Sequence, residues 1–198
     1  MAPASSQLLR LLLAVAADAC AAAMVTRIAP VKIEVTGINS RRISSSIRVQ
    51  SDMSAVWKVL TDYDRLASIV PNLVASRRVT APRGVVRVYQ EGAQSVVGLD
   101  FRASLTMDMQ EIRRDALLRP LPSWTLKFSC HDSVMFQQFS GEWKLSTLPQ
   151  QQGCELRYSV DITPKGAVPV PAIEWRIRED VPPNLNAIKQ VCEQASRG

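Results

Sequence analysis

Histidine, serine and carboxylate side chains that stand close together can indicate hydrolytic or proton-transfer chemistry. The one histidine of this sequence, His131, precedes Asp132 and Ser133 directly. A catalytic triad is defined by the geometry of its members, and neighbours on one turn seldom orient each other in that way. His131 stands between two apolar alternating segments, a position typical of an exposed turn. We therefore predict a solvated or structural role for it and assign no catalytic residues.

Cysteines are the next residues that could react or bind a metal. Cys20, Cys130, Cys154 and Cys192 are far apart and form no C-x-x-C pair. With a single histidine, the chain lacks the spacing of a standard zinc site, so we predict no metal. It also lacks a glycine-rich phosphate loop. We expect the cysteines to be free thiols. Formation of one disulfide is the alternative if the compartment is oxidising.

Two polar side chains fall among apolar positions. Gln90 follows Val86 and Val88 at even spacing, and Tyr158 lies between Leu156 and Val160. Either side chain could anchor a quinone carbonyl or a lipid head group, or could complete a hydrogen bond at the rim of the core. Both interpretations stay open.

The elements that must position these residues follow from apolar alternation. Every odd residue of 99–109 is apolar and every even residue is polar, which is typical of a strand with one dry and one wet face. The same pattern recurs in residues 124–129, 143–146 and 155–162, and further strands are expected at 43–49, 73–80 and 85–91. Short turn-like connections favour antiparallel pairing.

Two helical segments can cover the dry face of this sheet. The first spans residues 52–61, with Ser51 or Asp52 as N-cap. Its apolar stripe consists of Met53, Val56, Trp57 and Leu60. A second short helix is expected through Leu66, Ile69 and Val70, ending at Pro71, while Asp62 and Asp64 serve as caps or face solvent.

The last helix is expected at residues 172–195. Its apolar face is formed by Ile173, Ile177, Leu185, Ile188 and Cys192. Pro182 and Pro183 interrupt the pattern and predict a kink or a break. Residues 168–171, rich in proline, are expected to form a stiff extended linker.

The segment 1–30 is rich in alanine, poor in acidic residues and interrupted by Arg10 and Asp18. Its longest uninterrupted apolar run is shorter than the roughly 20 residues that a membrane-spanning helix needs. These features favour an organelle transit peptide over a secretory signal or an irregular N-terminus, ordered or disordered, with no targeting role. One domain is expected at 31–198.

The net charge of +6 is spread along the chain and is compatible with contact to an anionic membrane. No nucleic-acid motif accompanies this charge.

The order of elements, and three motifs, carry a family resemblance. The motifs are S-D-M-S-A-V-W-K-V-L-T-D-Y-D-R-L-A-S-I-V-P-N-L at 51–73, F-S-G-E-W-K-L at 139–145 and P-V-P-A-I-E-W at 169–175. The chain resembles the START-like helix-grip superfamily over residues 31–196. Within it, the sequence is similar to the branch of polyketide cyclase/dehydrase and coenzyme-Q-binding START proteins, and it resembles plastid proteins of plants and algae.

This resemblance implies an α+β helix-grip fold: a curved antiparallel sheet around a long C-terminal helix, with a short helix pair after the first strand. It also implies a cavity for a lipid, isoprenoid or quinone. The side chains expected to line the cavity are Gln90, Phe101, Ala103, Leu105, Met107, Trp124, Leu126, Phe128, Trp143, Tyr158, Val160, Ile177 and Leu185. Small Ala103 and Gly141 are expected to leave room. The same inward-facing apolar residues would also be expected if they packed together into a solid core with no cavity.

We therefore expect a carrier or chaperone for a hydrophobic molecule, without a resident cofactor, in a chloroplast or plastid, the mitochondrion being the alternative. A quinone or lipid would be bound as ligand. Two alternatives remain: a polyketide cyclase or dehydratase, and an interaction module with a filled core. The lack of paired carboxylates on the inward face favours binding over catalysis.

Overall fold

A computed structural model describes residues 28–96, 99–114, 122–148, 152–166 and 170–196. The expected targeting segment therefore lies almost wholly outside the described residues. The elements, in chain order, are β1 Lys32–Val35, β2 Arg41–Val49, α2 Met53–Thr61, η1 Tyr63–Ser68, β3 Leu73–Val79, β4 Val86–Val96, β5 Leu99–Arg114, β6 Ser123–Ser133, β7 Phe136–Thr147, β8 Cys154–Pro164 and α3 Val170–Ala195.

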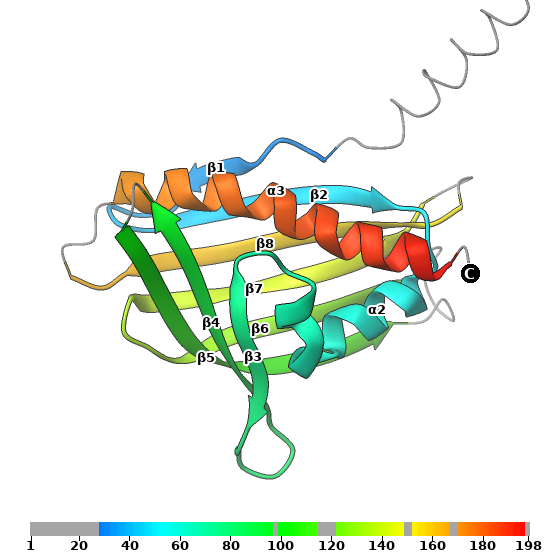
Figure 1. Cartoon of the computed structure of the whole chain (residues 1–198), viewed down its shortest axis with the longest axis horizontal. Helices are drawn as coiled ribbons and strands as arrows, with labels where there is room; N and C mark the ends of the chain where they lie inside the picture. The colour runs from blue at the N-terminus through cyan, green and yellow to red at the C-terminus, as the bar shows by residue number, and fades with distance from the viewer. Residues whose placement is uncertain (1–27, 97–98, 115–121, 149–151, 167–169, 197–198) are drawn as a thin grey trace, which may run out of the picture.

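The strands form one eight-stranded antiparallel sheet in the order β1-β2-β8-β7-β6-β5-β4-β3. The sheet curves, and α3 lies across its concave side with its C-terminal end beside α2 (Figure 1). This arrangement confirms the predicted α+β helix-grip fold. The helix pair α2 and η1 follows the second strand instead of the first, because the alternation did not predict the short β1. The two edges of the sheet, β1 and β3, do not pair with each other.

Register follows from the alternating pattern, because each strand has one apolar face to bury. Along β2 and β8, Ile43 lies opposite Val160, and Ile47 lies opposite Leu156. These four side chains are buried, whereas Ser44, Ser46, Arg157 and Ser159, which alternate with them, are more exposed. The dry face of the sheet is thus the face that α3 covers.

The first helix agrees with its predicted apolar stripe. Met53, Val56, Trp57 and Leu60 are all buried, and Asp52 occupies the N-cap position. The short helix that follows is a 3-10 helix and ends at Ser68, before the predicted end at Val70. It lies against β3, where the Ser76 hydroxyl donates to the Tyr63 carbonyl at 2.5 Å and the Arg78 amide donates to Asp64 at 2.8 Å.

The last helix corrects one expectation. α3 is continuous from Val170 to Ala195, with Pro182 and Pro183 inside it, so of the expected kink or break the structure excludes the break. The prolines lack amide donors for the carbonyls one turn earlier. Burial of Val181 and Leu185 on either side of the pair holds the helix against the sheet despite that loss. Of the predicted linker at 168–171, Val170 and Pro171 belong to the helix, and residues 168 and 169 lie outside the described ranges.

The larger of two clusters of buried apolar residues includes the buried face of α2. There Trp57 meets Trp124 edge to face at 5.6 Å, and the Arg113 guanidinium lies over both rings. Leu185 and Leu156 are fully buried in the same cluster.

No helix within the described ranges is long and apolar enough to cross a membrane.

Candidate ligand-binding pocket

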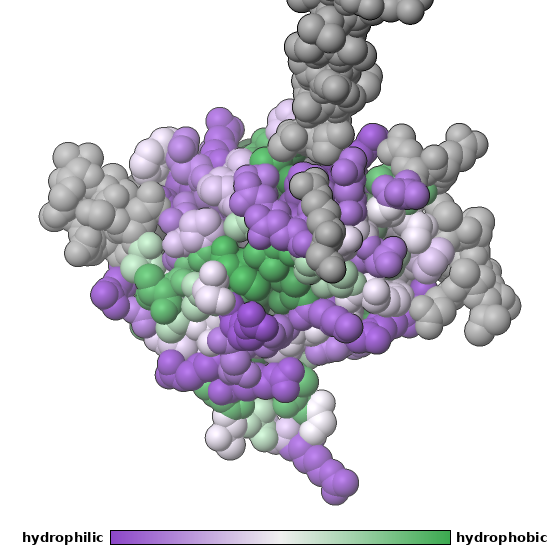
Figure 2. All heavy atoms as spheres, turned by 45° about the vertical axis from the view of Figure 1, so that its right-hand side comes forward, coloured by the Kyte–Doolittle hydropathy of each residue, from purple (hydrophilic) through white to green (hydrophobic). Residues whose placement is uncertain are grey.

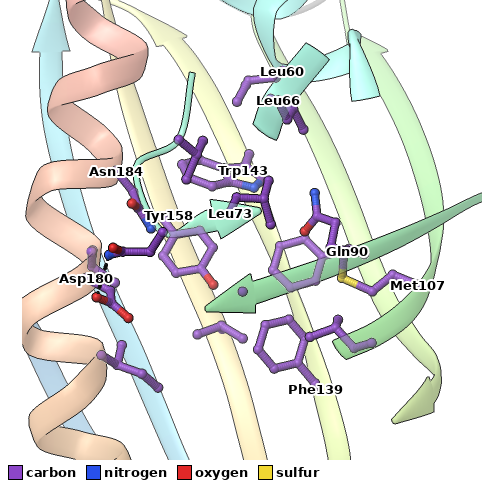
Figure 3. Close-up of a pocket in the computed structure, with 18 of the residues that line it drawn as sticks. Leu60, Leu66, Leu73, Gln90, Met107, Phe139, Trp143, Tyr158, Asp180 and Asn184 are labelled. Atoms are coloured by element: carbon purple, nitrogen blue, oxygen red, sulfur yellow. Dashed lines mark hydrogen bonds between the residues drawn. The ribbon is translucent and has the colours of Figure 1, made fainter. Parts of the chain in front are cut away.

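A cavity of about 280 Å³ lies between the concave face of the sheet and α3 (Figure 3). The sheet contributes Gln90, Gly92, Ala103, Leu105, Met107, Met109, Leu126, Phe128, Phe139, Trp143, Tyr158 and Val160. The α2–β3 region adds Leu60, Leu66, Val70, Asn72 and Leu73, and α3 adds Ile177, Asp180, Val181, Asn184 and Ile188. Its size is near the lower end for small-molecule sites, and its lining is mostly apolar as such sites require.

Most of the predicted lining meets in this cavity. The sheet residues are Gln90, Ala103, Leu105, Met107, Leu126, Phe128, Trp143, Tyr158 and Val160, and α3 supplies Ile177. The side chain of Phe101 lies outside the described part of the chain. A band of hydrophobic residues between hydrophilic margins is visible on one face of the molecule (Figure 2).

Two predicted lining residues lie elsewhere. Trp124 is an inward residue of β6, but its ring packs on Trp57 of α2 in the filled part of the core. Leu185 is fully buried against the same cluster, one turn beyond Val181. Alternation predicts which face a residue occupies, but it does not predict where along that face the covering helix closes the space.

Gly141 also has a different role from the expected one. A Cβ atom there would lie 2.1 Å from the Ser159 carbonyl oxygen, 2.7 Å from the Phe128 ring and 2.8 Å from the Val160 Cα. The missing side chain therefore allows β8 and the Phe128 ring to approach β7 closely. The space that we expected Gly141 to leave is occupied.

Sequence reasoning missed the polar wall of the pocket on α3. The Asn72 amide donates to Asp180 Oδ1 at 2.7 Å, and Arg176 Nη2 lies 2.7 Å from the same oxygen. Burial raises the pKa of Asp180, and the nearby Arg176 opposes this rise. Asn184, one turn further along, has a buried Oδ1 for which the described residues offer no hydrogen-bond partner.

A signal for this wall is present in the sequence. Ile177, Val181 and Ile188 define a helical stripe, and Asp180 and Asn184 lie on the same stripe at spacings of three and four residues. Sequence reasoning missed it because only the apolar residues of this face were considered as lining.

Tyr158 and Gln90 differ in how freely their polar atoms meet the pocket. Burial raises the pKa of Tyr158, so its hydroxyl keeps its proton. Its ring contacts Trp143 at 4.5 Å, and its hydroxyl has no hydrogen-bond partner among the described residues. Gln90 Nε2 donates to the Ser76 hydroxyl at 3.3 Å, which fixes that side chain to β3.

The residues with hydrolytic potential do not form a site. His131 and Asp132 are exposed in β6, so His131 lies in a strand rather than in the expected turn. The Ser133 hydroxyl is buried and accepts hydrogen bonds from the Met135 and Phe136 amides, both at 3.2 Å. It supports the β6–β7 turn.

The cysteines within the described ranges are free thiols, with Cys154 and Cys192 buried and Cys130 half-buried. Cys20 lies outside those ranges. The described part of the chain contains no cluster of metal-ligating side chains.

Comparison with known families is informative at this point. The family model of "polyketide cyclase / dehydrase and lipid transport" matches residues 49–189, most of the chain. The chain belongs to this family. Comparison of the sequence with curated proteins gave no match.

Solved structures support the fold of this family member. A STAR-related lipid transfer protein from Xanthomonas axonopodis is 14% identical, with a TM-score of 0.62, over 82% of this chain and 98% of that one. The Zhui aromatase/cyclase from Streptomyces sp. R1128 is 17% identical, with a TM-score of 0.60, over 80% and 97%. Human StAR-related lipid transfer protein 5 is 9% identical, with a TM-score of 0.63, over 96% and 99%. At these identities the likeness concerns the fold alone.

Proposed function

We propose that the protein binds a hydrophobic small molecule between its sheet and α3 and carries or chaperones it. The observation that carries this proposal is the mostly apolar cavity of about 280 Å³, which the side chains of the concave face leave open. A module with a wholly filled core does not account for that space. The lipid-transfer proteins among the structural neighbours share the fold that builds it.

Affinity in such a pocket comes mainly from apolar burial. Each methylene removed from water contributes about 0.8 kcal/mol. A lipid or isoprenoid chain can therefore bind without many polar contacts. Met107 and Met109, with flexible thioether side chains, can adjust to an irregular ligand.

The finer identity of the ligand and the place of action extend this proposal. A prenylated quinone, as in coenzyme-Q-binding START proteins, combines an apolar chain with carbonyl groups that Tyr158 could bind. The composition of residues 1–30 supports import into a plastid or, as the alternative, a mitochondrion. Mass spectrometry of the mature N-terminus, together with the location of a tagged full-length chain, tests this; a mature protein that begins at Met1 would contradict it.

Transient contact with an anionic membrane is the accompanying proposal. The net charge of +6 supports it. Co-sedimentation with phosphatidylserine-containing vesicles should fall as salt is raised, whereas vesicles of phosphatidylcholine alone should bind little. Equal binding to both compositions would contradict an electrostatic contact.

The central test blocks the cavity. Leu105 lies on the pocket wall and is only partly buried, so Leu105→Trp should fill the space with little loss of folding free energy. We expect lipids extracted from the purified wild-type protein, detected by native mass spectrometry, to be absent from this variant. In a solid core the same change would cost about 1 to 3 kcal/mol. Ligand-free wild-type protein in repeated preparations would count against a carrier.

A cyclase or dehydratase is the second candidate. It is supported by the hydroxyl of Tyr158, a hydrogen-bond donor in a mostly apolar pocket for which the described residues offer no partner, and by the aromatase/cyclase among the structural neighbours. Turnover of an aromatic polyketide substrate that Tyr158→Phe abolishes would establish this activity. Turnover by neither protein would contradict a cyclase activity on that substrate.

A further inference from the structure

The polar wall of the pocket on α3 has a particular hydrogen-bonding character. Asn184 Oδ1 is buried, faces no donor in the described residues and belongs to a residue that lines the cavity. Asp180, one turn earlier, lines the same cavity, and its contacts with Asn72 and Arg176 both reach Oδ1. Figure 3 shows Asp180 and Asn184 side by side on α3 at one side of the pocket.

A buried acceptor without a donor is costly, since it has lost its hydrogen bonds to water. Two neighbouring acceptor groups are satisfied by a ligand that donates. An ionised carboxylate cannot donate, and it would meet the Asp180 charge. An ammonium group can donate, but Arg176 already compensates Asp180, and an extra buried charge is expensive to desolvate. A neutral hydroxyl donates to these acceptors at the smallest desolvation cost.

We propose that this wall, formed by Asn184 and Asp180, binds the hydroxyl group of an amphipathic alcohol whose apolar body occupies the rest of the cavity. The proposal rests on the proposed function and specifies a ligand with a hydroxyl donor in place of the prenylated quinone, whose carbonyl groups cannot donate to this wall. The Phe128, Phe139 and Met107 side chains, on the sheet side of the pocket, contact the apolar body.

The test compares three probes that share one chain and differ in the head group: decanol, decanoate and decylammonium. Calorimetric titration of the purified full-length protein at pH 7.5 should give the highest affinity for decanol. Asn184→Leu should reduce decanol affinity about five- to tenfold, the size of one lost hydrogen bond, and leave decanoate affinity unchanged. Asn184→Ser, which keeps an acceptor, should retain part of the preference.

The matched control is Asn39→Leu, the same chemical change at an exposed residue of the β1–β2 turn. It should leave all three affinities at the wild-type values. Unchanged decanoate binding by Asn184→Leu also shows that this variant is folded. If no probe binds to the wild-type protein, the carrier function itself fails. If the three bind equally, if decylammonium binds best, or if Asn184→Leu keeps the preference for decanol, only the head-group assignment is overturned.

Discussion

At the scale of single residues, burial determines the chemistry of the thiols. Burial raises the pKa of Cys154 to about 12 and that of Cys192 to about 11. Both thiols therefore stay protonated, and a protonated thiol is a poor nucleophile. The side chains serve as small apolar residues between β8 and α3.

These raised pKa values predict both reactivity and stability. At pH 8, iodoacetamide should modify neither Cys154 nor Cys192 in the folded protein, and both should react in urea, as peptide mapping would show. Because the pKa of each folded-state thiol lies above its ordinary value near 9, the folded state holds its protons longer. The contribution of these groups to stability is fully present below pH 9 and is lost as the pH rises towards 11 and 12. Rapid native-state labelling of either thiol would contradict this burial.

Residue roles could be predicted from sequence only where alternation decides them. Leu105, Met107 and Tyr158 face inward because strand periodicity requires it. The unpartnered oxygen of Asn184 could not be predicted, since hydrogen-bond satisfaction depends on which side chains of the sheet approach α3. Trp124 was misplaced for a similar reason: Trp57, distant in sequence, occupies the space beside it.

At the scale of elements, β7 and α3 depart from regular structure in different ways. β7 contains Gly141, where β8 approaches so closely that no side chain fits. α3 contains Pro182 and Pro183, which weaken its hydrogen bonding beside the pocket residues Val181 and Asn184. One feature fixes the shape of the sheet, and the other gives the covering helix a locally weaker segment.

Gly141→Ala should destabilise the fold by about 3 kcal/mol, because the new methyl group meets backbone atoms of Ser159 and Val160 that cannot move without separating β7 from β8. Urea denaturation gives the free energy of unfolding. Gly92→Ala is the control, since its Cβ would lie 3.4 Å from the nearest atom, the Asn72 carbonyl oxygen. Its effect should stay within about 1 kcal/mol. Equal losses in the two variants would refute the role of the close β7–β8 approach.

Pro183→Ala should stabilise the fold, in contrast to Gly141→Ala. Pro183 is exposed, and an alanine amide could donate to the Glu179 carbonyl and complete the helical ladder. We expect a gain of about 1 to 3 kcal/mol in the free energy of unfolding and, since α3 covers the pocket, slower ligand release in stopped-flow measurements. Unchanged stability would show that the proline pair does not weaken α3.

At the scale of the whole molecule, the space between sheet and helix is divided. The end near α2 is filled by large side chains, and the middle of the concave face remains open. The architecture could be predicted, because strand alternation and the three family motifs both specify it. The hollow could not, since an apolar stripe that lines a cavity and one that fills a core have the same pattern in sequence.

The open edges of the sheet have a consequence for solubility. Along β3, the 3-10 helix η1 and the Asp64 carboxylate occupy the outer side of the strand, where the Arg78 amide would otherwise be available to another chain. β1 is only four residues long and presents Lys32 and Glu34 as an ion pair. Short, charged or covered borders of this kind prevent sheets of separate molecules from joining into fibrils. Detachment of η1 would therefore be the event that exposes the protein to aggregation, even while its hydrophobic interior stays intact.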